Sequence, residues 1–115
     1  MEIHHISSEW LSISRVEEIL EMGMRLALSN YARQRITGCR EYLDKKMATQ
    51  KEPIYGITTG FGSLCNISID ADQLSQLQKN LVMSHSCSIG ERVPAEIVRL
   101  MLLTKIQSLS YGYSG

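Results

Sequence analysis

Residues 55–62 read Tyr-Gly-Ile-Thr-Thr-Gly-Phe-Gly and lie between two segments with helical periodicity. Three glycines in eight residues indicate a backbone that reaches positive φ or approaches another group closely, which favours a loop over a strand or a helix. The loop also carries two threonine hydroxyls and two aromatic rings, which a simple spacer would not need. Taken alone, the composition fits a functional loop, and it also fits a structural turn with Tyr55 and Phe61 as core anchors.

Two well-known glycine-rich loops do not fit this stretch. A phosphate-binding loop needs Gly-x-x-x-x-Gly-Lys-Ser/Thr, but Gly56 and Gly60 lack that spacing and no lysine follows Gly62. A dinucleotide fingerprint beginning at Gly60 would require a glycine at position 65, where the chain has Cys65. The loop is therefore neither of these nucleotide-binding motifs.

The loop instead resembles the tyrosine loop of the aromatic amino acid ammonia-lyases, whose pattern is Tyr-Gly-x-Asn/Thr-Thr-Gly-Phe-Gly. Residues 77–85, Leu-Gln-Lys-Asn-Leu-Val-Met-Ser-His, resemble the first core helix of that family, and residues 98–110 resemble the next one. The resemblance extends along nearly the whole chain and is closest to the histidine ammonia-lyases. The family also includes phenylalanine and tyrosine lyases and the related aminomutases.

This resemblance implies a mainly α fold with a few short strands near the N-terminus, as the N-terminal part of the helical lyase fold. Residues 1–115 would form one N-terminal lyase domain, with the loop at 55–62 and core helices at about 70–85 and 94–110. Family members are several times longer, and the chain stops directly after an apolar segment. We therefore expect a fragment that lacks the catalytic Ala-Ser-Gly region.

Local patterns predict the individual elements. Alternation predicts short strands at 2–6, 10–13 and 24–28. Ser14 and Glu17 have the spacing of a capping box for a short helix that ends at Gly23. Ser29 would cap a helix over about 30–49, and Asp70 with Gln73 would cap the next. Pro94 suits the first turn of a last helix. Residues 97–109 are apolar on nearly every side, so this helix is expected to be buried, against a partner if the fragment stands alone.

Composition excludes several classes of partner. The chain has 12 Lys and Arg against 12 Asp and Glu, so its net charge of zero argues against a nucleic-acid surface. No apolar run is long enough to span a membrane, and no signal peptide is recognisable. The odd set of Cys39, Cys65 and Cys87 lacks the spacing of a metal site and fits reduced thiols in the cytoplasm. We expect no metal.

Tyr55 is the first candidate catalytic residue. Elimination of ammonia requires a base that removes a weakly acidic β-proton, and a free tyrosine with a pKa of about 10 is mostly protonated at neutral pH. A catalytic Tyr55 therefore needs surroundings that stabilise phenolate, whereas a structural Tyr55 needs only a partner for its hydroxyl. The family resemblance implies the acid/base role.

The same resemblance implies a methylidene-imidazolone cofactor, formed autocatalytically from an internal Ala-Ser-Gly. This chain contains no such tripeptide, since its single Ser-Gly, Ser114-Gly115, follows Tyr113. We therefore expect these 115 residues to be inactive when alone.

His85 is the second candidate, at the end of an amphipathic helix. It could simply satisfy the last carbonyl groups of that helix. The pair Ser84-His85 resembles the histidine lyases, in which this histidine meets the substrate side chain, so His85, Ser84 and Gly62 are the implied substrate-binding residues. Thr58 replaces the usual asparagine of histidine lyases, and residues 86–88, Ser-Cys-Ser, replace their usual Ala-Ala-Gly.

The sequence therefore predicts part of a lyase that converts L-histidine to trans-urocanate, with a small aromatic amino acid as substrate and a homo-oligomer, a tetramer in the family, as its assembly. A tyrosine or phenylalanine ammonia-lyase, or an aminomutase, is the alternative within the family. A non-catalytic helical module that oligomerises through its last helix is the alternative outside it.

Overall fold

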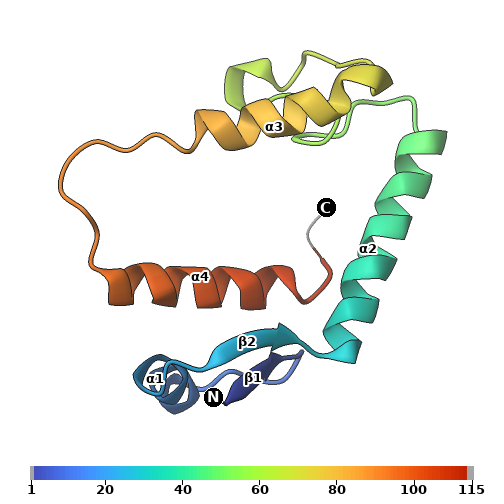
Figure 1. Ribbon diagram of the computed structural model, residues 1–115. Coiled ribbons are helices and arrows are strands. Elements are labelled where there is room, and N and C mark those ends of the chain that lie inside the picture. The colour runs from blue at the N-terminus through green and yellow to red at the C-terminus, as the bar shows by residue number, and fades with distance from the viewer. Residues whose placement is uncertain (1, 114–115) are drawn as a thin grey trace. The chain divides into compact units, whose positions relative to one another are not determined.

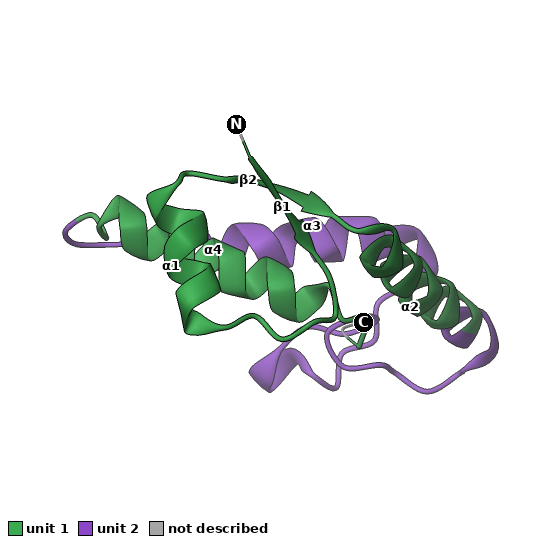
Figure 2. Cartoon of the chain, turned by 90° about the horizontal axis from the view of Figure 1, so that it is seen from below, with its two compact units in different colours: residues 1–45, 92–115 green, residues 46–91 purple. Residues whose placement is uncertain are grey.

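The computed structural model describes residues 2–113, which divide into two compact units, residues 1–45 with 92–115 and residues 46–91 (Figures 1 and 2). As predicted, the structure is mainly α-helical with short strands near the N-terminus. The first unit holds β1 (Ile3–Ile6), α1 (Ile13–Glu21), β2 (Arg25–Leu28), most of α2 (Asn30–Thr49) and α4 (Ala95–Leu109). The second holds 3₁₀ turns at Gly62–Leu64 and Ala71–Gln73, and α3 (Leu74–Ser84).

The two strands pair in parallel, with Ile3 opposite Arg25 and Ile6 opposite Leu28. Parallel neighbours cannot be joined by a tight turn, and α1 provides the crossover between them (Figure 1). Ile6 is 1% exposed at the end of β1. The predicted strands at 2–6 and 24–28 are thus confirmed, within one residue at each end.

The predicted strand at 10–13 is wrong, because Ile13 already begins α1. Ser12 has an extended backbone, and its hydroxyl accepts a hydrogen bond from the Arg15 N–H at 3.2 Å. Ser12 is therefore the N-cap of α1, and the capping box predicted at Ser14 and Glu17 does not form.

A small apolar core joins α1 to α4. Ile19 of α1, Met24 beside β2 and Leu103 of α4 are each less than a tenth exposed, and Leu11 and Val16 pack against them. Burial of such side chains contributes roughly 1.5–3 kcal/mol each. This cluster holds the last helix against the N-terminal β-α-β segment.

A buried amide ties the end of α4 to the loop after β1. Gln107 is 6% exposed, and its Nε2 donates to the Ser7 carbonyl at 2.8 Å and to the Tyr111 hydroxyl at 3.1 Å. A buried amide without partners would be costly, so these bonds fix the position of α4.

Residues after α4 pack against α2. Gly112 has φ +74°, and a Cβ atom there would lie 2.7 Å from the Arg35 carbonyl oxygen. Arg35 also donates to the Tyr111 carbonyl at 3.3 Å, and its guanidinium lies 5.0 Å from the centre of the Tyr113 ring. A residue larger than glycine would therefore separate this segment from α2.

The apolar residues of α4 are only partly covered by the described part of the chain. Leu103 and Gln107 are its buried residues, whereas Met101 and Leu102 are 60% and 57% exposed. A helix that is apolar all round requires burial on all sides. The exposed residues therefore form a surface that a further partner could cover.

The predicted N-caps of the helices that became α2 and α3 differ in outcome. The Ser29 hydroxyl accepts from the Ala32 N–H at 3.1 Å, so the predicted cap of α2 is confirmed. The Asp70 side chain makes no capping bond; its backbone carbonyl accepts from the Gln73 N–H at 2.9 Å within a 3₁₀ turn. The predicted side-chain cap at Asp70 is wrong, and α3 begins at Leu74.

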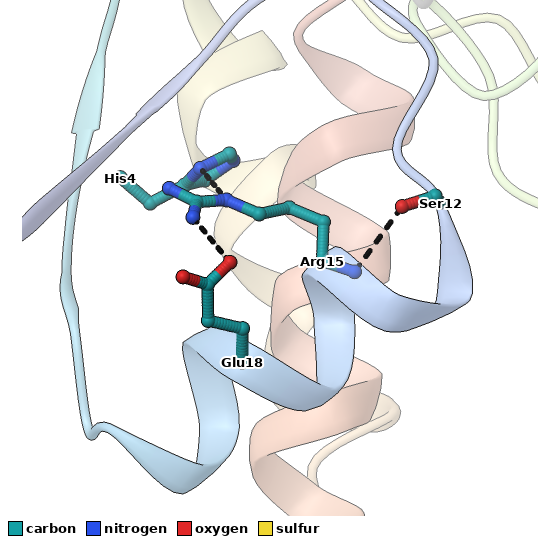
Figure 3. Close-up of polar contacts among 4 residues, drawn as sticks. All are labelled: His4, Ser12, Arg15 and Glu18. Atoms are coloured by element: carbon teal, nitrogen blue, oxygen red, sulfur yellow. Dashed lines mark hydrogen bonds and ion pairs between the residues drawn. The ribbon is translucent and has the colours of Figure 1, made fainter.

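His4 links β1 to α1 through Arg15 (Figure 3). The Arg15 Nε donates to His4 Nδ1 at 3.4 Å, while another nitrogen of its guanidinium pairs with the Glu18 carboxylate. Burial, followed by the charges of Arg15 and His5, lowers the pKa of His4, and Glu18 opposes this with a smaller effect. His4 is therefore held as a neutral ring whose Nδ1 accepts a hydrogen bond.

We expect this contact to make stability depend on pH. The pKa of His4 in the folded protein lies below its ordinary 6.5, so the unfolded chain binds the proton more tightly. The contribution of His4 to the free energy of unfolding is therefore fully present above pH 6.5 and falls as the pH drops below that value. His4→Gln should reduce that fall, because glutamine can still accept from Arg15 but does not titrate. Thermal unfolding at a series of pH values measures the effect. His5→Gln, which removes only the smaller contribution of the exposed neighbour, is the comparison and should reduce the fall less, and an unchanged pH dependence in His4→Gln would refute the expectation.

Candidate functional site

The loop at 55–62 is held by its own hydroxyls. The Thr58 Oγ1 accepts from the Ile54 N–H at 2.8 Å, and the Ile54 carbonyl in turn accepts from the N–H groups of Ile57 and Thr58. Thr59 is fully buried, and its Oγ1 accepts from the Gly56 N–H at 3.3 Å and donates to the Gly60 carbonyl at 3.0 Å. The two threonines thus give the loop one defined path.

Gly56 allows the loop to fold back on itself. It has φ +70°, and a Cβ atom there would lie 2.5 Å from Cε1 of Phe61. No other residue satisfies both the left-handed backbone and the close approach of the ring without strain. Gly56 therefore allows Phe61 to lie next to Tyr55, the residue before the glycine.

Tyr55 presents its phenol at the surface of this unit, with 62% of the residue exposed. Its hydroxyl oxygen accepts from the Gly62 N–H at 3.4 Å, and its ring centre lies 5.6 Å from that of Phe61. A backbone N–H directed at an oxygen stabilises negative charge that develops there. Gly62, predicted as a substrate contact, thus also lies against the predicted catalytic oxygen.

His85 caps α3 at its C-terminal end. Its Nδ1 lies 2.8 Å from the Leu81 carbonyl oxygen and 3.0 Å from the Ser84 Oγ, and that hydroxyl also donates to Leu81 at 2.9 Å. Because a carbonyl oxygen can only accept, the ring carries its hydrogen on Nδ1 in this contact. In the neutral ring, Nε2 is therefore left as a hydrogen-bond acceptor.

Phe61 connects the two candidate residues. Its ring meets His85 edge to face, with centres 5.8 Å apart and planes at 83°, and its centre lies 5.6 Å from that of Tyr55. Such tilted and edge-to-face pairs are favourable arrangements of aromatic rings. The structure therefore joins Tyr55, Phe61 and His85 by successive ring contacts, which we call the aromatic row. Gly62 contacts Tyr55 and Ser84 contacts His85, so residues up to thirty positions apart in the sequence meet here.

The sequence did not indicate two of the residues that build this row. Phe61 was recognised only as a possible core anchor, although it is 42% exposed and contacts both Tyr55 and His85. Gln78 of α3 donates from Nε2 to the carbonyls of Gly56 and Ile57, at 3.0 and 3.3 Å. Nothing in the helical pattern distinguishes Gln78 from any other exposed glutamine, so periodicity could not have identified it.

Residues 2–113 show neither a metal-binding cluster nor a membrane-spanning helix. Among these described residues, no group of three or more His, Cys, Asp or Glu side chains is arranged to hold a metal ion. Nor is any helix in this part of the chain long and apolar enough to cross a membrane.

Comparisons with known proteins give one consistent result. Residues 11–115 match the family model described as aromatic amino acid lyase. The chain is 42% identical to the histidine ammonia-lyase of Symbiobacterium thermophilum over 105 residues, which are 91% of this chain and 20% of that protein.

Among solved structures, the chain resembles histidine ammonia-lyase from Trypanosoma cruzi (33% identity, TM-score 0.76) and tyrosine aminomutase from Streptomyces globisporus (26% identity, TM-score 0.84). Each of these two likenesses covers 97% of this chain and 21% of the other. The chain thus spans about a fifth of the length of the relatives it matches.

Proposed function

This chain belongs to the aromatic amino acid lyase family, and on that premise we propose that it acts as the N-terminal part of an ammonia-lyase that converts L-histidine to trans-urocanate. The active protein would be the family-length protein, the longer chain that contains these 115 residues. The single observation that carries the proposal is the row formed by Tyr55, Phe61 and His85. The proposal is supported by the contacts of Phe61 with Tyr55, a phenol that can exchange a proton, and with His85, a ring that can bind a substrate side chain.

Tyr55 would take the β-proton of the amino acid. The phenolate oxygen would form a bond to this hydrogen, and the electrons of the C–H bond would become the new carbon–carbon double bond. The protonated amino group would leave as ammonia, taking the electrons of the C–N bond. The Gly62 N–H, 3.4 Å from the Tyr55 oxygen, would stabilise the negative charge that the base must carry. Exposure of Tyr55 leaves its oxygen accessible to a substrate.

The electrophile implied by the family resemblance, a methylidene-imidazolone formed from Ala-Ser-Gly, would supply the activation that lets the amino group leave. Residues 1–115 contain no Ala-Ser-Gly, so they do not fit the formation of this group. The group would come from elsewhere in the family-length protein, and the role of this chain is to hold the base and the residue that meets the side chain.

His85 would select the substrate through its free ring nitrogen. With Nδ1 directed at the Leu81 carbonyl, Nε2 accepts a hydrogen bond, which a substrate imidazole N–H or phenol O–H can donate. A phenyl ring would leave this nitrogen unpaired, which costs about 1–3 kcal/mol, or roughly ten- to hundredfold in kcat/KM. We therefore rank histidine first, tyrosine second and phenylalanine third. Histidine ranks above tyrosine because the Ser84-His85 pair resembles that of the histidine lyases.

The test is an assay of the family-length protein with all three amino acids, following urocanate, coumarate and cinnamate by absorbance. We expect L-histidine to give the largest kcat/KM. A larger value for tyrosine would overturn the histidine assignment and leave an ammonia-lyase of different specificity.

An aminomutase is the second candidate, favoured by the TM-score of 0.84 to a tyrosine aminomutase. Such an enzyme would return the amino group to Cβ rather than release it. Product analysis separates the two, since a lyase accumulates ammonia and the unsaturated acid in equal amounts, whereas an aminomutase accumulates a β-amino acid.

The assembly is a further part of the proposal. The exposed apolar residues of α4, including Met101 and Leu102, would be covered in a cytoplasmic homo-oligomer of the family-length protein, such as a tetramer.

A further inference from the structure

Among the described residues, one side chain of an α-helix donates hydrogen bonds to the loop that carries Tyr55. Gln78, on the exposed side of α3, directs its Nε2 at two successive carbonyl oxygens, those of Gly56 at 3.0 Å and Ile57 at 3.3 Å. A primary amide nitrogen carries two hydrogens, so it can serve both carbonyls. These carbonyls belong to the two residues immediately after Tyr55.

The hydrogen bonds of Gln78 connect the loop to α3. Within the described part of the chain, the other hydrogen bonds of residues 54–60 join the loop to itself or to the Ile69 N–H, which donates to the Thr58 carbonyl. Gln78 instead joins it to the helix whose end carries His85. It thereby fixes the base-bearing loop relative to the residue that would bind the substrate.

We propose that Gln78 is a positioning residue for the reaction, which holds Tyr55 in place through the Gly56 and Ile57 carbonyls without touching the substrate. The inference rests on the proposed function, because it assigns Gln78 a role for the base of that reaction. The contact itself, however, can be tested whether or not the protein is a lyase.

Gln78→Met removes both donors and keeps a side chain of similar length. In the family-length protein we expect kcat for L-histidine to fall about tenfold to hundredfold, because only a fraction of molecules would hold Tyr55 correctly. KM should change much less, because His85 on α3 is unaffected. The matched control is Gln76→Met on the same helix, where Gln76 is exposed and bonds only to Asn80 at 2.7 Å.

Gln78→Glu provides a readout that a merely structural role would not produce. An ionised carboxylate has no hydrogen to donate and would face two carbonyl oxygens, whereas the protonated acid can donate one. The ratio of kcat in Gln78→Glu to kcat in the unmodified enzyme should therefore rise as the pH is lowered. The corresponding ratio for Gln78→Met should stay flat.

Hydrogen exchange separates failure of this inference from failure of the proposed function. The amides of Ile57 and Thr58, which donate to Ile54, should exchange faster in Gln78→Met than in Gln76→Met, even if no amino acid is turned over. Equal exchange in the two variants would overturn the inference. In an active enzyme, two further results would overturn the inference. One is a ratio of kcat in Gln78→Glu to kcat in the unmodified enzyme that does not change with pH. The other is a loss of kcat in Gln76→Met equal to that in Gln78→Met.

Discussion

Tyr55→Phe should lower kcat for L-histidine by several orders of magnitude in the family-length protein. The substitution deletes one oxygen, which is the atom that would accept the β-proton. The ring and its contact with Phe61 remain, so the fold should be preserved. Steady-state formation of urocanate measures the loss, and the absorbance of the imidazolone, which this change should leave intact, shows that the rest of the site has formed.

A matched tyrosine provides the control. Tyr31 of α2 is 51% exposed and lies outside residues 46–91, so Tyr31→Phe should leave turnover unchanged. Near-normal activity in Tyr55→Phe would show that Tyr55 is a structural tyrosine, whose hydroxyl only receives the Gly62 N–H.

His85→Leu should lower kcat/KM for L-histidine by about ten- to hundredfold. The substitution removes the Nε2 acceptor, so the buried imidazole N–H of the substrate would lose a partner, which costs about 1–3 kcal/mol. Phenylalanine makes no such bond, so its kcat/KM should change less and the gap between the two substrates should narrow. Parallel kinetics with both amino acids measure this change in selectivity.

The histidine of β1 offers a comparison for this variant. His5 is exposed on the strand and belongs to the other unit, so His5→Leu should leave the ratio of the two kcat/KM values as it is. An equal loss for histidine and phenylalanine in His85→Leu would contradict the selectivity role and would indicate that His85 only caps α3.

The parts of the fold that sequence predicted well depend on local signals. The helical spacing of apolar residues located α2 and α4, and Pro94 marked the start of the latter, where it is the N-cap. Ser29 caps α2 as expected because its hydroxyl reaches an N–H only three residues away. Such signals involve one turn of chain and do not depend on the rest of the protein.

The errors arose where two local solutions competed. Ser12 and Ser14 both precede the apolar face of α1, and Ser14 alone has a glutamate three residues later. The earlier serine became the cap because Leu11 packs against the core below it, and this fixes where the chain turns into the helix. Tertiary packing therefore decided the boundary, and the apparent alternation of residues 10–13 had no structural meaning.

Tyr55 and His85 could be predicted from the sequence, but Phe61, which contacts both of them, could not. The motif indicated Tyr55, and the Ser-His pair indicated His85, but their proximity depends on how the loop folds back over Gly56. Phe61 contacts Tyr55 and His85, which are six and 24 positions away, and Gln78 contacts backbone more than twenty positions away. Neither composition nor periodicity records such contacts. Both were visible only once the loop and α3 had been placed together.

The most direct test of the central claim is a crystal structure of the family-length Tyr55→Phe protein soaked with L-histidine, since substrate should persist in this variant. The account predicts an imidazole nitrogen within about 2.7–3.2 Å of His85 Nε2, with the substrate Cβ facing the ring at position 55. Histidine bound with its imidazole away from His85, or bound at another part of the protein, would contradict the account.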